Sequence, residues 1–233
     1  MAVPSSVAAS SVAASSLAPS SAQAPVATLT DRRSRREELI DAADRLIQRD
    51  GPAVSMASIA AEAGITKPIL YRPFGDKGGL YAALAERHTQ RLLQVLQDAL
   101  AGGGSTRERV ERTIGAYLAT IEAEPQVYRF LVHSSEFPAA AQAHGQVQSF
   151  LRRFSELLAL GIASELGLKP GSPRAETWAR GIVGMVQTAG DWWLLTGSPD
   201  RDAVVRELTD LLWGAYPEAA ARRTPGGRPR KGD

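Results

Sequence analysis

Apolar residues recur at spacings of three and four along nearly the whole chain from Arg33 onward, and this period limits the possible folds more than any other feature. The first such segment places Leu39, Ile40 and Ala43 on one side of a helix. Glycine or proline follows each periodic segment, and both residues end helices. No segment shows sustained alternation of apolar and polar residues between hairpin turns. The sequence therefore predicts an all-α protein.

The positions of helix-capping and helix-breaking residues predict the order of the helices. We expect short helices after Ser55 and Thr66, with Pro73 limiting the second of them near residues 71–72. Longer helices are expected at 33–50, about 76–100, 106–124, 126–135, 139–166, 174–195 and 200–216.

Composition excludes several classes of protein. The net charge is only +2, so any attraction to nucleic acid must be local. The chain has no cysteine, and its three histidines lie far apart without ligand spacing, so we expect no metal site and no disulfide. No catalytic motif such as GxSxG, a Walker loop or HExxH is present, so we expect neither an enzyme nor a cofactor. No stretch is apolar enough to span a bilayer, which predicts a cytoplasmic protein with no membrane partner.

The two ends of the chain have the composition of unfolded segments. Residues 1–31 are rich in Ala, Ser and Pro and lack the positive region of a secretory signal, so we interpret them as a disordered leader. Residues 218–233 form a basic, flexible tail, in which GGRPR is similar to the core of AT-hook peptides that bind the minor groove. A solvated basic tail has the same composition.

The segment Ser55 to Phe74, SMASIAAEAGITKPILYRPF, has the layout of a helix-turn-helix, two short helices joined by a turn that contains glycine. Ala60 is small where the helices must cross, and Gly64 can adopt the positive φ of the turn. The second helix of such a motif enters the major groove of double-stranded DNA. Two ordinary core helices share this spacing, so the alternative of simple packing stays open. The core between these helices is expected to contain Ile59, Ile65, Ile69 and Leu70.

The runs IDAADRLIQRDG and ITKPILYRPFGDKGGLYAAL resemble the TetR family of transcription regulators over roughly residues 33 to 85. The resemblance implies that Thr66, Lys67 and Pro68 touch bases or nearby backbone, and that Tyr71 and Lys77 bind phosphates. Tyr71 could instead be an aromatic residue packed between helices, and the arginines before residue 37 a solvated helix start. The DNA contacts expected from this reasoning are Arg33, Arg36, Ser55, Thr66, Lys67, Pro68, Tyr71, Arg72 and Lys77.

Two positions depart from the family pattern. Pro73 stands where the family commonly has His, and Gly78-Gly79 stand where acidic helix formers are usual. These residues affect the geometry of the connection after the second short helix and the rigidity of the long helix expected at about 76–100, at its start.

The domain organisation follows from these segments. We expect a three-helix helix-turn-helix DNA-binding domain over 32–78 and a larger helical effector-binding and dimerisation domain over 79–217. All four tryptophans lie late, in two helices that carry apolar residues around much of their circumference. These helices resemble the pair that forms the four-helix dimer interface in the TetR family, although one thick intramolecular core would need the same residues. The homodimer interface is expected to contain Trp178, Ile182, Val204, Leu208, Leu211 and Ala215.

The segments EPQVYRFL and GIVGMVQTAGDWWL are similar to the sensor domains of a FasR-like, acyl-CoA-responsive group within that family. The resemblance implies an apolar or amphipathic effector, such as fatty acyl-CoA, in a cavity between helices. A dry helical core would contain the same kinds of residue. The residues expected to line the cavity are Tyr117, Ile121, Tyr128, Phe130, Leu131, Phe154, Met185 and Trp192.

The sequence therefore predicts a ligand-responsive repressor that binds a palindromic operator as a dimer. The alternative is an architectural or adaptor DNA-binding protein that responds to no ligand. An internal cavity would distinguish the two hypotheses, because only the sensor needs one.

Overall fold

The structure is a computed structural model that describes residues 29–132 and 141–221, with side chains described from 33 to 132 and from 141 to 214. These residues form helices and no strand, which confirms the all-α prediction. Residues 29–31 of the expected leader and 218–221 of the expected tail are helical, because α1 and α9 continue into them, and the rest of both segments lies outside the described residues. The helices are α1 Leu29–Asp50, α2 Met56–Glu62, α3 Lys67–Phe74, α4 Lys77–Ala101, α5 Thr106–Ala123, α6 Pro125–Val132, α7 Ala141–Glu165, α8 Pro173–Thr196 and α9 Arg201–Ala221.

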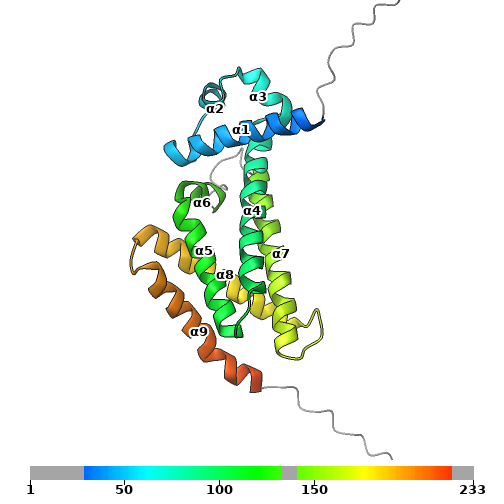
Figure 1. Cartoon of the computed structure of the whole chain (residues 1–233), viewed down its shortest axis with the longest axis vertical. Helices are drawn as coiled ribbons and strands as arrows, with labels where there is room; N and C mark the ends of the chain where they lie inside the picture. Colours follow the sequence, from blue (N-terminus) through cyan, green and yellow to red (C-terminus); the bar gives the residue numbers. More distant parts are fainter. Residues whose placement is uncertain (1–28, 133–140, 222–233) are drawn as a thin grey trace, which may run out of the picture.

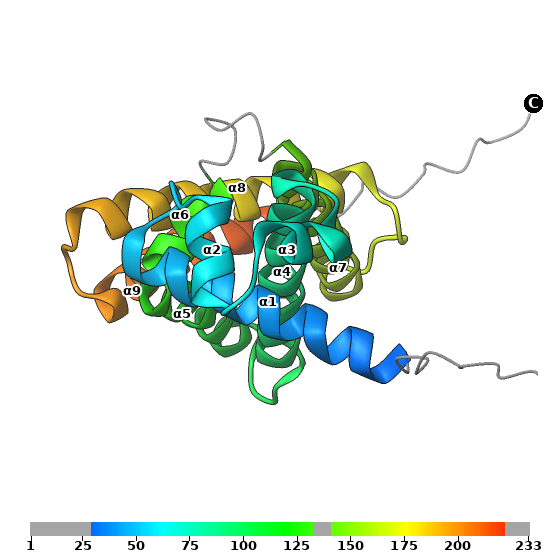
Figure 2. The ribbon, with the colours of Figure 1, turned by 90° about the horizontal axis from the view of Figure 1, so that it is seen from above.

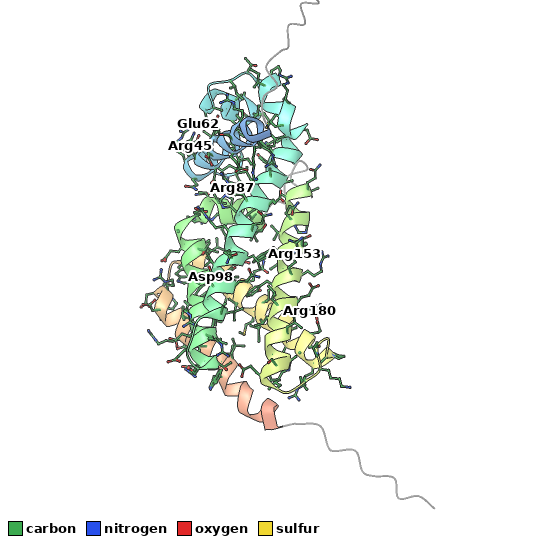
Figure 3. The ribbon with its side chains drawn as sticks, turned by 45° about the vertical axis from the view of Figure 1, so that its right-hand side comes forward. Arg45, Glu62, Arg87, Asp98, Arg153 and Arg180 are labelled. Atoms are coloured by element: carbon green, nitrogen blue, oxygen red, sulfur yellow. The ribbon has the colours of Figure 1, made fainter. Side chains whose placement is uncertain are left out.

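The helix-turn-helix has the local geometry that its sequence predicts. Ser55, in an extended conformation, accepts a hydrogen bond from the backbone N–H of Ser58 at 3.0 Å and so begins α2. Gly64 makes the turn with φ of +63°. Arg45 of α1 lies 3.7 Å from Glu62, the last residue of α2, in an ion pair whose arginine is exposed and whose glutamate is half-buried (Figure 3).

The third helix runs to Phe74, two residues beyond the predicted end. Pro73 lies in its last turn, where the missing N–H removes one hydrogen bond and leaves the rest of the helix intact. Gly75 then ends the helix with φ of +78°, and its N–H bonds the carbonyl of Tyr71 at 2.7 Å.

The first turn of α4 explains the departure of Gly79 from the family pattern. A Cβ atom at Gly79 would lie 2.0 Å from the carbonyl oxygen of Phe74, so no other residue fits without a shift of the backbone. Asp76 accepts a hydrogen bond from the Gly79 N–H at 2.8 Å and caps the helix. The glycine therefore permits the close turn between α3 and α4, and the cap offsets its poor helix propensity.

The remaining helices form the larger part of the molecule, below α1, α2 and α3 in Figure 1. α4 and α7 lie side by side along its length, α5 packs on α4, and α9 covers the outer side of α5. Viewed from above, α1, α2 and α3 form a layer over this bundle (Figure 2). In the part of the chain that the structure describes, no helix is long and apolar enough to cross a membrane.

The short helix α6 contacts both parts of the molecule through adjacent sides. Val127 and Phe130 are 3% and 1% exposed and belong to the core around the helix-turn-helix. The ring of Phe130 packs edge-on against Tyr81 of α4, with centroids 4.7 Å apart. Tyr128, from the same helix, packs instead against Tyr117 of α5. α6 therefore belongs to both the helix-turn-helix core and the bundle.

Candidate functional site

The exposed side of α3 and the residue before it carry four of the DNA contacts that the sequence predicts. Thr66, Lys67, Pro68 and Arg72 are all exposed. The Thr66 side chain makes no capping hydrogen bond, so its hydroxyl is free to bind another partner. Ile69, expected in the core, is 44% exposed on the same helix, because its neighbour Leu70 occupies the buried side. The surface of α3 thus combines donors and acceptors with one apolar side chain.

The residues expected at phosphates lie beside α3. Tyr71 is half-buried and packs partly on the core, so packing and a phosphate contact are compatible for it. Lys77 is the first residue of α4, and its Nζ lies 5.0 Å from the centroid of the Tyr81 ring. A cation held at a helix N-terminus beside backbone N–H groups suits a phosphate oxygen.

The other three predicted contacts have separate positions. Arg33 is exposed on the first turns of α1. Arg36 places its guanidinium 5.4 Å above the ring of Phe74, which fixes it between α1 and α3. Ser55 caps α2, with its hydroxyl also 2.8 Å from the Ser58 hydroxyl.

The larger part of the molecule contains a cavity of about 600 Å³, lined by residues of α4, α5, α6, α7, α8 and α9. Its lining is almost wholly apolar, including Leu96, Phe150, Leu158 and Val183. A volume of this size falls within the range of small-molecule sites. Of the residues that the sequence predicts for such a cavity, the structure brings together Tyr117, Tyr128, Leu131, Phe154 and Met185.

Three of the residues expected at the cavity lie elsewhere. Ile121 is 2% exposed in the core between α5, α8 and α9, and Phe130 packs on Tyr81. Trp192 is 53% exposed on α8, whereas Trp193 points inward and donates its indole N–H to the carbonyl of Pro199 at 2.8 Å. Neighbouring aromatic residues on one helix face different ways, and the pattern alone does not tell which one faces the interior.

The residues expected at the dimer interface are also divided. Trp178 and Ile182 line the cavity. Val204 and Leu208 are 5% and 7% exposed and pack against α5 within the same chain. Leu211 is 62% exposed, and the side chain of Ala215 lies outside the described residues.

One group of polar residues lies where α5, α6 and α8 meet. The Tyr128 hydroxyl donates a hydrogen bond to the carboxylate of Asp191, and the Tyr117 and Tyr128 hydroxyl oxygens lie 2.9 Å apart. Burial raises the pKa of Tyr117 above its ordinary value. Burial, followed by the neighbouring Tyr117 and Asp191, raises the pKa of Tyr128. Both side chains therefore remain hydroxyls that can donate and accept.

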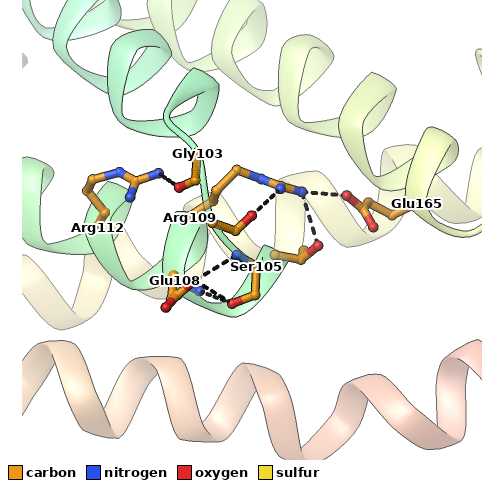
Figure 4. A network of polar contacts seen from close by, with 8 residues as sticks. Gly103, Ser105, Glu108, Arg109, Arg112 and Glu165 are labelled. Carbon is orange, nitrogen blue, oxygen red and sulfur yellow. Dashed lines mark hydrogen bonds and ion pairs between the residues drawn. The ribbon is translucent and has the colours of Figure 1, made fainter.

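The second polar group of the cavity lies at the start of α5. Arg109 forms an ion pair with Glu165 of α7, and both residues line the cavity (Figure 4). No sequence pattern predicts this pair, because 56 residues separate its members and neither belongs to an apolar stripe. Among the residues with described side chains, no cluster of His, Asp and Glu suits a metal ion.

An exposed recognition helix within a helix-turn-helix, set on a helical bundle with a cavity, defines a DNA-binding transcription regulator. Residues 39–84 match the family described as bacterial regulatory proteins of the tetR family, and residues 95–228 match the tetracyclin repressor-like C-terminal domain. The chain belongs to the TetR family, and it is a regulator of transcription rather than an enzyme.

Individual relatives agree with this assignment. An uncharacterized HTH-type transcriptional regulator of Mycobacterium tuberculosis is 33% identical over 182 residues, which cover 78% of this chain and 76% of that protein. The HTH-type transcriptional activator FasR of Mycolicibacterium smegmatis is 29% identical over 80% of this chain and 84% of its own. Two solved structures share the fold. A tetR-family regulator of Streptomyces coelicolor has a TM-score of 0.64 and 24% identity, covering 81% of this chain and 86% of its own. FadR of Bacillus subtilis, in complex with stearoyl-CoA, has a TM-score of 0.60 and 18% identity, covering 76% and 96%.

Proposed function

We propose that this regulator is a ligand-responsive repressor. It binds a palindromic operator as a homodimer in the cytoplasm, where DNA is accessible, and a small apolar or amphipathic effector releases or modulates it. A fatty acyl compound is the effector class that the cavity favours, because the lining is almost wholly apolar. FadR of Bacillus subtilis, a structural neighbour, was solved with such a compound.

The observation that carries the proposal is the double role of α6. Tyr128 and Leu131 line the cavity, while Val127 and Phe130 of the same helix pack into the helix-turn-helix core. A ligand that moves α6 therefore changes the packing beneath α1 and the start of α4. Such a shared element gives the two sites a physical connection, and an architectural protein has no need of the cavity.

The test is operator binding in the presence of acyl compounds. An operator is first selected by the purified protein from a random DNA library, and its Kd is then measured with and without stearoyl-CoA and free fatty acids. Native mass spectrometry of the same samples shows whether the ligand is bound. We expect an acyl compound to bind and to change the operator Kd by about fivefold or more, the range of ordinary allosteric coupling.

A matched pair of substitutions distinguishes a change in the cavity from a similar change on the surface. Met185→Trp narrows the cavity, whereas Leu160→Trp makes a similar change at a residue of α7 that is 52% exposed. We expect only Met185→Trp to abolish the ligand response. A response that survives in Met185→Trp, or operator binding that no ligand alters, would contradict the effector role.

The homodimer is proposed because a single helix-turn-helix contacts only a few base pairs, and paired units about 34 to 36 Å apart give useful affinity. The exposed residues Gly184, Thr188, Trp192 and Leu195 recur at spacings of four, four and three on one side of α8. Trp192 and Leu195 are 53% and 72% exposed, which is unusual for such large apolar side chains in a monomer. This side of α8, with Leu211 of α9, is the proposed interface.

Sedimentation of two variants tests the interface. Leu195→Asp is expected to give a folded monomer with greatly weakened operator binding. Leu208→Asp places a charge in the core against α5 and is expected to unfold the chain instead. An unchanged sedimentation mass for Leu195→Asp would exclude this side of α8.

A further inference from the structure

The apolar cavity has polar groups near both ends of its contact with α5, while Thr113 between them donates its hydroxyl to the carbonyl of Arg109 at 2.7 Å. Arg109 and its partner Glu165 lie near the first turn of this helix, and Tyr117 lies two turns further on. Eight residues of helix separate Arg109 from Tyr117, a rise of about 12 Å. A ligand that fills the space between them meets a charged pair at one end and a hydroxyl at the other.

Arg109 is the fixed member of the charged pair. Its guanidinium donates to the carbonyl of Gly104 and to the hydroxyl of Thr106, both at 3.0 Å, besides bonding Glu165 (Figure 4). Glu165 forms no second ion pair within the described part of the chain, and its side chain is 39% exposed. A carboxylate that entered from the cavity could replace Glu165 on Arg109, while Glu165 turned to water and Arg109 kept its other two bonds.

The protons of the tyrosine pair can be assigned. Tyr128 gives its only hydroxyl proton to Asp191, so the 2.9 Å contact between the hydroxyls requires Tyr117 to donate to Tyr128. The hydroxyl oxygen of Tyr117 accepts no hydrogen bond from the described residues, and Tyr117 lines the cavity. At this end the cavity therefore offers an acceptor, and a ligand group that donates a proton would satisfy it.

The position of Tyr117 is held by the packing of α8. A Cβ atom at Gly190 would lie 3.0 Å from the Tyr117 ring, so this glycine lets α8 approach α5 and bring Asp191 to the pair. The acceptor is thus part of a tightly packed wall.

We propose that the effector is an amphipathic acid whose carboxylate binds Arg109 in place of Glu165 and whose chain carries a hydroxyl group that donates to Tyr117. This inference rests on the proposed effector function and specifies the ligand of that same cavity. The class it names is hydroxylated straight-chain acids, in preference to plain acids, alcohols or cationic amphiphiles.

Calorimetric titration of four compounds of equal chain length tests both ends of the ligand. The compounds are dodecanoate, dodecanol, ω-hydroxydodecanoate and dodecyltrimethylammonium. We expect the full-length protein to bind dodecanoate about tenfold more tightly than dodecanol, because only dodecanoate has a carboxylate that can replace the 39% exposed Glu165 on Arg109. The hydroxylated acid should bind about fivefold more tightly than dodecanoate, and the cation most weakly.

Three variants and one control show which residues cause these differences in affinity. Arg109→Gln should remove the preference for dodecanoate over dodecanol, whereas Arg153→Gln, on the exposed side of α7, should leave it intact. Tyr117→Phe should remove only the gain from the ω-hydroxyl. Tyr128→Phe frees the Tyr117 proton, so ω-oxododecanoate, which accepts, should gain affinity in this variant alone. Thermal unfolding of each variant checks that it is folded.

Each outcome has a distinct meaning. Equal affinity for dodecanoate and dodecanol in the unsubstituted protein would overturn the role of Arg109. A hydroxylated acid that bound no better than dodecanoate would overturn the role of Tyr117. If dodecanol and dodecanoate both bound and both changed the operator Kd equally, the effector function would stand and this inference would fail. If none of the four compounds bound while stearoyl-CoA still changed the operator Kd, this inference alone would fail, and if stearoyl-CoA also had no effect, the effector function would fail with it.

Discussion

The imidazole of His88, on α4, lies 3.0 Å from a carboxylate oxygen of Asp44, on α1. The other ring nitrogen lies 3.2 Å from Glu124, at the end of α5. His88 is only 7% exposed, so water has little access to these contacts. Arg87, the preceding residue, bonds Glu37 of α1 at 3.1 Å. Together these side chains attach the first helix of the helix-turn-helix to the helices that surround the cavity.

Asp44→Asn is expected to alter the acid dependence of stability. Burial acts to raise the pKa of Asp44, but the hydrogen bond and charge of His88, with Arg87 and Gln48, outweigh it and hold the pKa below 3.8. A lowered pKa means that the carboxylate stabilises the folded state above the ordinary pKa and that this contribution is lost as the pH falls through the folded value. The variant should lose about 1 to 2 kcal/mol of unfolding free energy at neutral pH, and the difference should close in acid.

Urea unfolding at a series of pH values measures the pH dependence of the unfolding free energy, with Asp98→Asn, at an exposed residue, as the control. A difference from the unsubstituted protein that is the same at every pH would contradict it.

Gly79→Ala is expected to destabilise the junction of α3 and α4. The added methyl group would lie 2.0 Å from the Phe74 carbonyl oxygen, so the backbone must move. A loss of about 1 to 3 kcal/mol in unfolding free energy follows, with weaker operator binding because α3 shifts. Gly103→Ala is the control, because no atom lies within 4 Å of its Cβ position and its φ is not positive. Equal stability of the two variants would show that the turn can relax at no cost.

Lys77→Ala is expected to weaken binding to operator and to random DNA alike. Phosphate contacts release counterions, so the magnitude of the salt slope should fall by about one per half-site while sequence preference stays unchanged. Binding across a series of salt concentrations measures the slope. An altered base preference would show that Lys77 lies nearer the bases than proposed.

Thr66→Ala and Lys67→Ala are expected to behave in the opposite way. Both residues are exposed at the start of α3. Loss of a direct base contact should cost about 1 to 3 kcal/mol at one or two positions of each half-site. Single-base variants of the selected operator measure this. If both variants changed only the salt slope, the orientation of α3 in the groove would be wrong.

Ile69 is expected to contact a thymine methyl group, since it is the large apolar side chain exposed on α3. Replacing each thymine of the selected operator by deoxyuridine removes that methyl group and nothing else. One such replacement should weaken binding of the unsubstituted protein several-fold and leave Ile69→Ala unaffected. If no thymine replacement distinguished the two proteins, Ile69 would have no role in base recognition.

The helix-turn-helix was predictable because its signals are local. Ser55 caps the helix that follows it, and Gly64 adopts the positive φ that its position demands. The end of α3 was wrong by two residues, because a proline in the last turn costs one hydrogen bond and tertiary packing outweighs it. The family resemblance predicted where the helices lie, and the capping serine and the turn glycine give the physical reason for their ends.

The walls of the cavity were predictable only in part. Apolar spacing identifies which helices are buried on several sides, but the rotation of each helix about its own axis depends on its neighbours. Thus Trp193 rather than Trp192 points inward, and Phe130 packs toward the helix-turn-helix. Arg109 and Glu165 meet because a long arginine side chain at the start of α5 reaches the end of α7, a contact that no local pattern contains.

The shared position of α6 also constrains how such a regulator can diversify. Under the proposed function, residues of α5, α7 and α8 that line the cavity can be exchanged without touching the helix-turn-helix core, so that mutations there would alter ligand preference while operator recognition is inherited unchanged. Val127, Tyr128 and Phe130 follow one another within four residues, with Tyr128 at the cavity and the other two in the helix-turn-helix core. Selection on this segment therefore acts on both properties at once, and descendants with new effectors should differ less in α6 than in the helices around it.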